Sequence, residues 1–250
     1  MGSAVCHAVA SDHDLDLVAA IDPHHAGLDV RQVTGVEGTR LQVLGDAAGI
    51  SPTKPDVAVD FTRVDAAREN LEWCAANGVH AVVGTTGFNE SDVDRLRQMF
   101  TTSNCFIAPN FAVGAVLMMR FAELAAPYFE TAEIVELHHD KKVDAPSGTA
   151  MLTAQRMAGA SSDWAKDPTE QEVLPGARGG AGPADIRIHS VRLSGLVAHQ
   201  EVLLGTTGQS LSIRHDSYDR TSFMPGVLLA VKAVADRSGV TVGLDVLLGI

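Results

Sequence analysis

The chain has 250 residues, enough for one large domain or two smaller ones around a sizeable core. Apolar residues make up 46% and charged residues 20%, a balance that excludes intrinsic disorder, because disorder requires low hydrophobicity and high net charge. The 31 acidic residues outnumber the 19 basic ones and give a net charge of −12. Such a surface repels phosphate backbones and anionic lipids, so we expect neither nucleic acid nor a membrane as a partner.

The three cysteines, Cys6, Cys74 and Cys105, lie far apart and form no CxxC pair. We therefore expect neither a disulfide framework nor a thiolate zinc site, and a reducing cytoplasm is the natural location. The longest uncharged apolar stretch, from Phe111 to Met119, is about half as long as a membrane span requires. The N-terminus lacks the basic and apolar segments of a secretory signal.

The first half of the chain alternates short apolar runs with helical patterns, which is typical of βαβ units. The pattern predicts a helix over 3–10, strands over 17–21, 56–61, 79–83 and 105–108, and helices over 63–76 and 90–100. We expect Thr62 to cap the start of the helix that follows it, and Gly78 to end that helix. Near-continuous apolar strands of this kind indicate a parallel sheet that is buried on both faces.

After Phe111 the pattern changes to one helix followed by strands with alternating polarity. The predicted elements are a helix over 113–126, strands over 132–138, 185–193, 196–204 and 210–215, a helix over 224–235 and a strand over 241–247. We therefore predict an α/β protein in which a Rossmann-like parallel-sheet domain, formed by 1–110 and 218–250, carries an inserted α+β domain. The inserted domain, 111–217, is expected to contain a mixed or antiparallel sheet.

The front of the chain departs from the usual order of a dinucleotide-binding sheet. Such a sheet begins with a strand and a glycine-rich turn, and the next helix holds a pyrophosphate at its N-terminus. This sequence begins inside that helix, so a misassigned start codon, a shortened chain and a genuine absence of the first strand all stay open. Asp22 stands 20 residues after Gly2 at a strand end, where a carboxylate contacts the adenosine ribose. An ordinary strand-end turn is the alternative reading of Asp22 with the proline that follows it.

The segment 136–149 is the richest in groups that can do chemistry. His138 and His139 leave a predicted strand, Lys141 and Lys142 follow, and a Ser-Gly-Thr sequence opens a helix. Histidine exchanges protons near neutral pH, and a helix N-terminus binds anions, so together they suit a small polyanion that is protonated while it is held. Each part alone could be a surface feature or an ordinary cap. No third metal ligand stands at a familiar spacing, so we expect no metal site.

Two loops follow neighbouring predicted strands of the first domain. One is the Gly-Thr-Thr-Gly sequence over 84–87, and the other is the Pro-Asn-Phe sequence over 109–111. Ligands of open α/β sheets bind beyond the carboxyl ends of the strands, so both loops are candidates for one crevice. The second loop could equally be a simple linker between domains, and both interpretations can hold.

These segments together resemble the dihydrodipicolinate reductase family of the bacterial lysine and diaminopimelate pathway. The resemblance lies in 136–149, 84–87 and 108–111, and the segments 191–201 and 214–223 are similar to the actinobacterial branch. It covers essentially the whole chain. It implies that NADH or NADPH reduces 4-hydroxy-tetrahydrodipicolinate, a small dicarboxylate, to tetrahydrodipicolinate with loss of water. It also implies a homotetramer that is assembled through the sheets of the second domain.

The resemblance implies a role for each matching residue of the histidine-rich segment. His138 would be the proton donor and acceptor, and Lys142 would stabilise the charge that develops on the substrate. His139, Gly148 and Thr149 would bind the substrate carboxylates.

The resemblance also implies a cofactor site whose nicotinamide side is lined by Gly84, Thr85, Thr86, Ala108, Pro109, Asn110 and Phe111. Asp22 would contact the adenosine ribose, which favours NADH over NADPH without deciding between them. The family's first strand and Gly-x-x-Gly-x-x-Gly turn have no counterpart before Gly2. We therefore expect the chain as given to bind the cofactor weakly or not at all, because it lacks several amide–phosphate bonds.

Two other functions remain open from the sequence. The chain could be another two-domain Rossmann dehydrogenase, which would share the first half but not the histidine-rich segment. It could also be a non-catalytic or cofactor-deficient paralogue, for which the missing front end is the main support. The roles of Arg178, His199 and Arg220 are open, since loop arginines and strand-end histidines are commonly solvated.

Overall fold

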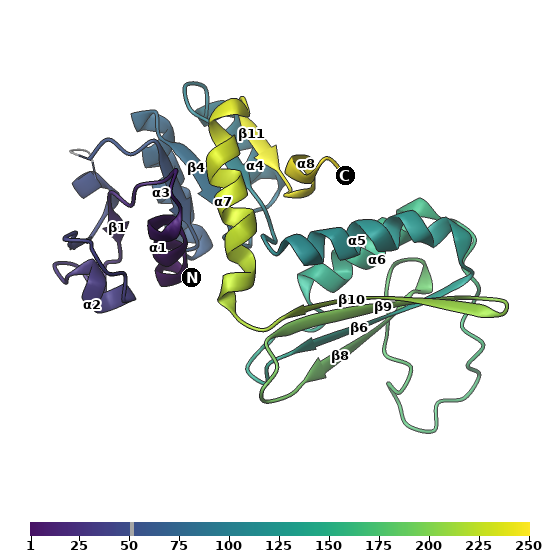
Figure 1. The fold of residues 1–250 in the computed structure, drawn as a ribbon. Helices are drawn as coiled ribbons and strands as arrows, with labels where there is room; N and C mark the ends of the chain where they lie inside the picture. The colour runs from purple at the N-terminus through teal and green to yellow at the C-terminus, as the bar shows by residue number, and fades with distance from the viewer. Residues whose placement is uncertain (51–52) are drawn as a thin grey trace. The chain divides into compact units, whose positions relative to one another are not determined.

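A computed structural model describes residues 1–50 and 53–250 and divides into two compact units (Figure 1). The first unit consists of residues 1–111 and 220–250, and the second of residues 112–219. The second unit is therefore an insertion in the sequence of the first. Among the helices of the described ranges, none combines the length and the hydropathy that crossing a bilayer requires.

The first unit contains four parallel strands in the order β11-β5-β4-β3, and a separate parallel pair, β1-β2. Its elements are α1 (Gly2–Ser11), β1 (Ala20–Ile21), α2 (Val30–Thr34), β2 (Val43–Leu44), the 3₁₀ helix η1 (Ala47–Ile50), β3 (Val57–Asp60), α3 (Val64–Asn77), β4 (His80–Val83), α4 (Glu90–Met99), β5 (Cys105–Ile107), η4 (Arg220–Phe223), α7 (Met224–Ala233), η5 (Val234–Asp236), β11 (Val240–Val242) and α8 (Asp245–Leu248). The parallel sheet predicted from the apolar runs is confirmed.

The central strands of this sheet are buried because they carry apolar side chains on both faces. Three residues of β4 and all of β5 are buried. The helix that precedes β4 ends as predicted, since Gly78 adopts the left-handed conformation at φ 69° and closes α3. Helix α4 begins with a capping box, in which Asn89 and Asp92 each accept a backbone N–H of the other.

Several predicted elements differ from the structure in ways that have physical causes. Arg63, not Thr62, occupies the N-cap of α3, because the Thr62 hydroxyl donates to the carboxylate of Asp60 instead. The predicted strand 241–247 is β11 followed by helix α8, since short apolar runs do not distinguish a strand from a helix. Elements α2, β2 and η1, of five, two and four residues, are not among the predicted elements.

The second unit is a five-stranded mixed sheet in the order β10-β9-β6-β8-β7. Its elements are α5 (Val113–Ala125), the 3₁₀ helix η2 (Ala126–Tyr128), β6 (Thr131–His138), α6 (Gly148–Ala160), β7 (Gly180–Ala181), η3 (Pro183–Asp185), β8 (Arg187–Arg192), β9 (Ala198–Thr206) and β10 (Gln209–Ser217). Strands β6 and β8 are parallel, and every other neighbouring pair is antiparallel. The mixed sheet is therefore as predicted, although β8 departs from the purely antiparallel pattern that its alternation suggested.

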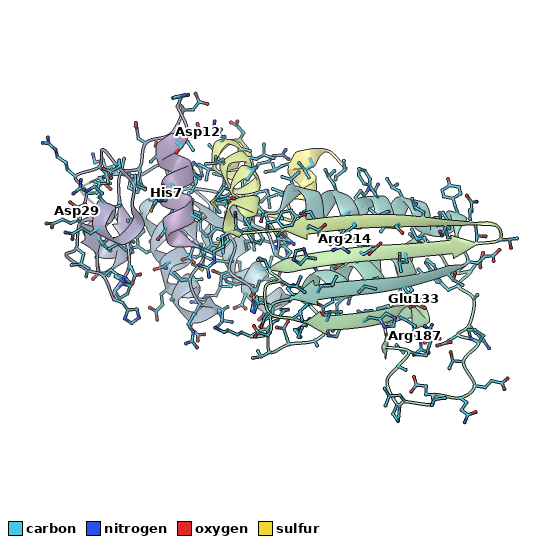
Figure 2. All side chains as sticks on the ribbon, turned by 60° about the horizontal axis from the view of Figure 1, so that its bottom comes forward. His7, Asp12, Asp29, Glu133, Arg187 and Arg214 are labelled. Atoms are coloured by element: carbon cyan, nitrogen blue, oxygen red, sulfur yellow. The ribbon has the colours of Figure 1, made fainter. Side chains whose placement is uncertain are left out.

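Helices α5 and α6 cover one face of this sheet (Figure 1). The core between them is built from apolar side chains of both layers, including Ile134, Val202 and Leu204 from the strands and Ala154 and Met157 from α6. Figure 2 shows the opposite face of the sheet, which carries charged side chains from several strands. The alternation of β6 therefore places one set of its residues under the helices and the other set on the open face.

Candidate active site

The last residue of β6, His138, lies on the face of the sheet that the helices cover. Glu136 precedes it by two residues, so both side chains point to that face, as does Ile134 of the core. The Glu136 side chain is fully buried, and that of His138 is 16% exposed. Their side chains are joined by a short hydrogen bond of 2.5 Å between His138 Nδ1 and Glu136 Oε2. A buried carboxylate therefore holds the imidazole at the end of the strand.

Arg192 on the neighbouring strand provides the positive charge that this carboxylate needs. The parallel register of β6 and β8 sets Arg192 directly beside His138. Its guanidinium donates to both carboxylate oxygens of Glu136, from Nη2 to Oε1 at 2.8 Å and from Nη1 to Oε2 at 2.9 Å. This two-point geometry is the strong form of an arginine–carboxylate contact, and it compensates a charge that would otherwise be buried alone.

The electrostatics of the pair follow from burial and from these contacts. Burial on its own raises the pKa of Glu136, but the hydrogen bonds it accepts, chiefly from Arg192, outweigh burial, so its pKa lies below the usual value. Burial lowers the pKa of His138, and Glu136 opposes this effect without reversing it. The nearby positive charges of Lys142 and Arg192 lower the His138 pKa further. Glu136 is therefore ionised and His138 is predominantly neutral at pH 7.

Lys142 lies in the loop that joins β6 to α6, close enough to His138 to influence its pKa. Its ammonium group donates to both carboxylate oxygens of Asp144, at 2.7 and 2.8 Å. The loop is tied to the sheet by Arg192, whose Nη2 also donates to the backbone carbonyl of Asp144 at 2.7 Å. Arg192 therefore contacts both the carboxylate that holds His138 and the loop that carries Lys142.

The loop ends at the N-terminus of α6, a helix of 13 residues. Ser147 is its N-cap, and the Ser147 hydroxyl accepts the backbone N–H of Ala150 at 3.2 Å. Gly148 is exposed and Thr149 is half-buried in the first turn, where the helix dipole favours an anion. His139 is exposed immediately after β6. The second unit thus brings imidazoles, an ammonium group and a helix N-terminus to the same end of its sheet.

In the first unit, the candidate cofactor loops follow neighbouring strands of the parallel sheet. Residues 84–87 follow β4, and residues 108–111 follow β5. The two loops are joined to the sheet by backbone bonds, from Gly84 N–H to the Asp60 carbonyl at 2.9 Å and from Ala108 N–H to the Val83 carbonyl at 3.0 Å. Both loops therefore begin at the carboxyl edge of the sheet, the edge at which open α/β sheets bind ligands.

A buried carboxylate organises the first of these loops. Asp60 ends β3 and is 8% exposed. It accepts the Thr85 hydroxyl at 3.1 Å, the Asn70 amide at 2.7 Å, and the backbone N–H and hydroxyl of Thr62, both at 2.7 Å. Thr85 also donates to the Thr62 carbonyl at 2.9 Å, whereas Thr86 is exposed. Thr85 thus anchors the loop inward, and Thr86 remains accessible.

Gly84 is required by the close approach of an aromatic ring. A Cβ atom at this position would lie 2.0 Å from a ring carbon of Phe61, so only glycine fits without a shift of the loop. The Phe61 ring packs against Phe111, with 5.8 Å between ring centroids, and Phe111 is buried. Of the other residues in the second loop, Ala108 is buried, Pro109 is exposed and Asn110 is half-buried. The aromatic pair therefore connects the two loops.

Asp22 follows directly after β1, at the carboxyl end of that strand. Its carboxylate accepts the backbone N–H of His24 and the ring of His25, both at 2.9 Å, and 42% of the side chain is exposed. The hydrogen bond from His25, followed by that from His24, lowers the pKa of Asp22. An ionised, exposed acceptor at a strand end suits a ribose hydroxyl. Its carboxylate and the loop glycines are the features of this unit that fit a dinucleotide.

Three residues had no role assigned from the sequence. The structure gives side-chain partners for two of them and an element for the third. Arg178 pairs with Glu133 at 2.7 Å and with Asp167 at 3.3 Å, on the open face of the sheet. His199 is buried, and its ring contacts Asp216 at 2.7 Å. Arg220 begins η4, where the chain returns to the first unit. Within 1–50 and 53–250, no group of three or more histidine, cysteine, aspartate or glutamate side chains is arranged to hold a metal ion.

Two residues of this site, Glu136 and Arg192, were assigned no role from the sequence. One signal for Glu136 was present, because an acidic residue two positions before His138 in a buried strand must share its face. Arg192 is 56 positions from Glu136, and only the pairing of β6 with β8 brings them together.

Comparison with known families matches almost the entire chain. The family described as dihydrodipicolinate reductase, N-terminus, matches residues 1–111, and that described as dihydrodipicolinate reductase, C-terminus, matches residues 114–248. The 4-hydroxy-tetrahydrodipicolinate reductase of Cutibacterium acnes is 49% identical, over 100% of this chain and 95% of its own length. The protein of the same name from Mycobacterium ulcerans is 47% identical, with the same coverage.

Solved structures agree with this family match. A dipicolinate-bound dihydrodipicolinate reductase from Paenisporosarcina sp. TG-14 is similar with a TM-score of 0.83 and 41% identity, over 98% of this chain and 94% of that one. A probable dehydrogenase from Thermotoga maritima has a TM-score of 0.63 at 13% identity, a likeness of fold alone.

Proposed function

This chain belongs to the dihydrodipicolinate reductase family, and from that premise we propose that it reduces 4-hydroxy-tetrahydrodipicolinate to tetrahydrodipicolinate with a pyridine nucleotide. The reaction would serve lysine and diaminopimelate biosynthesis. The observation that carries the proposal is His138 held by a buried carboxylate, with Lys142 beside it and the N-terminus of α6 at the end of the same loop. These groups suit a small dicarboxylate that accepts a proton.

The substrate carboxylates are assigned to the first turn of α6, at Gly148 and Thr149, and to His139. The helix dipole and the backbone amides of the first turn favour anions there. Loss of water from the 4-hydroxy substrate leaves a carbon–carbon double bond conjugated to its imine, and a nicotinamide, when bound, would supply a hydride to a carbon of that double bond. Lys142 would stabilise the negative charge that then moves toward the imine nitrogen, an interaction stronger in the transition state than in the ground state.

His138 is assigned the proton transfer. With Nδ1 bonded to Glu136, Nε2 is the nitrogen that remains for exchange with the substrate. The Lys142 ammonium must leave Asp144, at least in part, to reach a substrate group. Substrate carboxylates and Asp144 would therefore compete for the same cation.

The cofactor is assigned to the carboxyl edge of the first unit's sheet. Gly84, Thr85 and Thr86 would line the nicotinamide side together with residues 108–111. Asp22 would accept the hydroxyls of the adenosine ribose, and its negative charge disfavours the additional phosphate of NADPH. We therefore assign NADH as the preferred donor, and NADPH as a weaker one.

The assembly and the location complete the proposal. The open face of the second unit's sheet carries the apolar residues Val135, Leu137 and Leu203 among its charged pairs. A homotetramer would cover this face, and a cytoplasmic location suits a biosynthetic enzyme with three free, buried cysteines.

The test is an assay of substrate-dependent NADH oxidation by the purified chain, with NADPH measured in parallel. At saturating NADH we expect oxidation that depends on 4-hydroxy-tetrahydrodipicolinate, whatever the affinity for the cofactor, and inhibition by dipicolinate that competes with the substrate. Aspartate semialdehyde with phosphate, and galactose, serve as control substrates. Each is supplied with NAD⁺ or NADP⁺ in place of the reduced cofactor, because other two-domain dehydrogenases oxidise them. Activity with a control substrate, and none with the dicarboxylate, would show that the proposed function is wrong.

A further inference from the structure

We infer that Glu136, with Arg192 as its counter-ion, is a positioning residue that selects the Nδ1–H tautomer of His138 and so directs Nε2 to the substrate. The inference deepens the proposed function and rests on it for the role of His138. Which ring nitrogen of His138 carries the hydrogen can be measured in the protein without any substrate.

Glu136 can only accept hydrogen bonds. Its side chain is fully buried, and Arg192 donates to both of its oxygens, so the carboxylate is ionised. The ring nitrogen that faces an ionised carboxylate at 2.5 Å must carry the hydrogen. In neutral His138 the hydrogen therefore sits on Nδ1, and Nε2 has the free lone pair. Protonation of His138 then adds the proton at Nε2.

Arg192 also orients the carboxylate of Glu136. One oxygen, Oε1, accepts Nη2 of Arg192, whereas Oε2 is shared between Nη1 of Arg192 and Nδ1 of His138. Ser190, which lies beside Glu136 in the register of β8, also donates to the carboxylate. These donors engage both carboxylate oxygens and so hold in place the oxygen that faces His138. The imidazole plane is thereby held as well as its tautomer.

Charges of both signs face His138. Glu136 is negative, whereas Arg192 and Lys142 are positive, and Lys142 is itself paired with Asp144. If Glu136 loses its charge, two cations remain near the imidazole, and the protonated ring becomes less favourable. The pH at which His138 ceases to be a proton donor should then move downward.

The experiment is ¹⁵N NMR of histidine-labelled protein, compared between wild type and Glu136→Gln. In wild type at pH 8 we expect a protonated Nδ1 and an unprotonated Nε2 for His138. In Glu136→Gln the amide oxygen is held by Arg192 and the amide N–H faces the ring, so we expect the hydrogen to move to Nε2. We expect kcat to fall roughly 10²–10⁴-fold, as for a catalytic histidine in the wrong tautomer, with a much smaller change in KM. The basic limb of the kcat profile should shift to lower pH.

Glu133→Gln is the matched control. Glu133 lies on the same strand, but on the opposite face, and it also contacts a histidine, His189 at 2.7 Å, and an arginine, Arg178 at 2.7 Å. This variant removes the same charge from a similar cluster, so the His138 tautomer and kcat should be unchanged. Glu136→Asp keeps an acceptor-only carboxylate, so a folded Glu136→Asp protein should retain the hydrogen on Nδ1.

An Nε2–H tautomer in wild type, or an Nδ1–H tautomer in folded Glu136→Gln, would overturn the inference. If Glu136→Gln does not fold, loss of the Nδ1–H signal in folded Glu136→Asp would overturn it equally. A wild-type protein with the expected tautomer but without reductase activity would refute the proposed function and leave the tautomer assignment standing. The two failures are therefore distinguishable.

Discussion

At the scale of single residues, the site depends on where charge is buried and how it is compensated. Glu136 lies in a fully buried position, and an ionised carboxylate there would be strongly unfavourable without Arg192. The ion pair is not expected to add much net stability, because desolvating both groups opposes their attraction. The ion pair instead holds the Glu136 carboxylate in position as a hydrogen-bond acceptor at Nδ1 of His138. The same arginine also holds the carbonyl of Asp144, and so the loop of Lys142.

Removal of either candidate catalytic side chain should lower turnover without unfolding the protein. We expect His138→Ala and Lys142→Ala to reduce kcat by roughly 10²–10⁴-fold, because each loses proton transfer or charge stabilisation in the transition state. Steady-state NADH oxidation measures the loss, and circular dichroism checks the fold. Lys141→Ala is the control, since Lys141 is exposed in the same loop. Turnover near that of wild type in either variant would remove that residue from the mechanism.

Loss of Arg192 should destabilise the second unit in a manner that depends on pH. Arg192→Met leaves the Glu136 carboxylate buried without its counter-ion, which should cost about 3–5 kcal/mol in the free energy of unfolding at pH 7. In wild type the pKa of Glu136 is below its usual value, so this stabilisation is present above about pH 4.5 and is lost as the pH falls through the lower folded-state pKa. The difference between wild type and variant should therefore shrink on acidification.

Urea unfolding at several pH values measures this difference. The double variant Glu136→Gln with Arg192→Met removes both charges, and it should recover most of the lost stability at pH 7. A double variant as unstable as Arg192→Met would show that the buried charge is not the cause.

At the scale of elements, the conformation of the candidate cofactor loop 84–87 depends on the close approach of the ends of β3 and β4. Gly84 follows strand β4 directly, and the ring of Phe61, which follows β3, occupies the space that a side chain there would need. Asp60 at the end of β3 then holds Thr85 in the loop after β4. The Phe61 ring and the Asp60 carboxylate thus join the ends of the neighbouring strands β3 and β4. These two contacts position the backbone of the loop after β4.

A methyl group at Gly84 should disturb this loop. In Gly84→Ala the new Cβ meets the Phe61 ring at 2.0 Å, and overpacking of this kind typically costs ~1–3 kcal/mol. We expect lower thermal stability and weaker NADH binding by calorimetry. Adding Phe61→Ala should restore part of the affinity by making room for the methyl group. Gly159→Ala, which meets nothing within 4 Å in helix α6, should leave NADH binding unchanged.

At the scale of the whole molecule, assembly is proposed to involve the face of the mixed sheet opposite to the one that α5 and α6 of the same unit cover. That face carries Glu133, Glu201 and Arg214, with Leu203 38% exposed among them. Its charges are already paired with one another, as in the contact of Arg214 with Glu201 at 3.2 Å. In the proposed homotetramer, a second copy that covered this face would bury apolar side chains together with charges that are already paired.

Sedimentation velocity at micromolar concentration should show a tetramer for the wild type. Leu203→Glu sets a second negative charge beside Glu133, its partner in the β6–β9 register, and should convert the tetramer to smaller species. Phe121→Glu is the control, because Phe121 is 50% exposed on α5, on the other side of the sheet. A monomeric wild type would contradict the proposed assembly.

The sequence by itself determined the fold class and the segment that carries the chemistry. Apolar runs with intervening helical periods are local signals, and so the parallel sheet and the helix opening near Thr149 could be predicted. The histidines and lysines of the β6–α6 loop also stand together in the chain, so their grouping needed no tertiary information. Elements α2 and β2 were not predicted, and β2 is defined by its pairing with β1, which no local pattern specifies.

Only the tertiary structure decided which groups control His138. The contact of Glu136 with Arg192 spans 56 positions and depends on the parallel register of β6 and β8, which hydropathy periods do not specify. The same holds for Phe61 against Gly84 and for Thr85 on Asp60, which join the ends of different strands. Periodicity tells which face of a strand a residue occupies, whereas hydrogen bonding between distant strands decides which residue stands beside it.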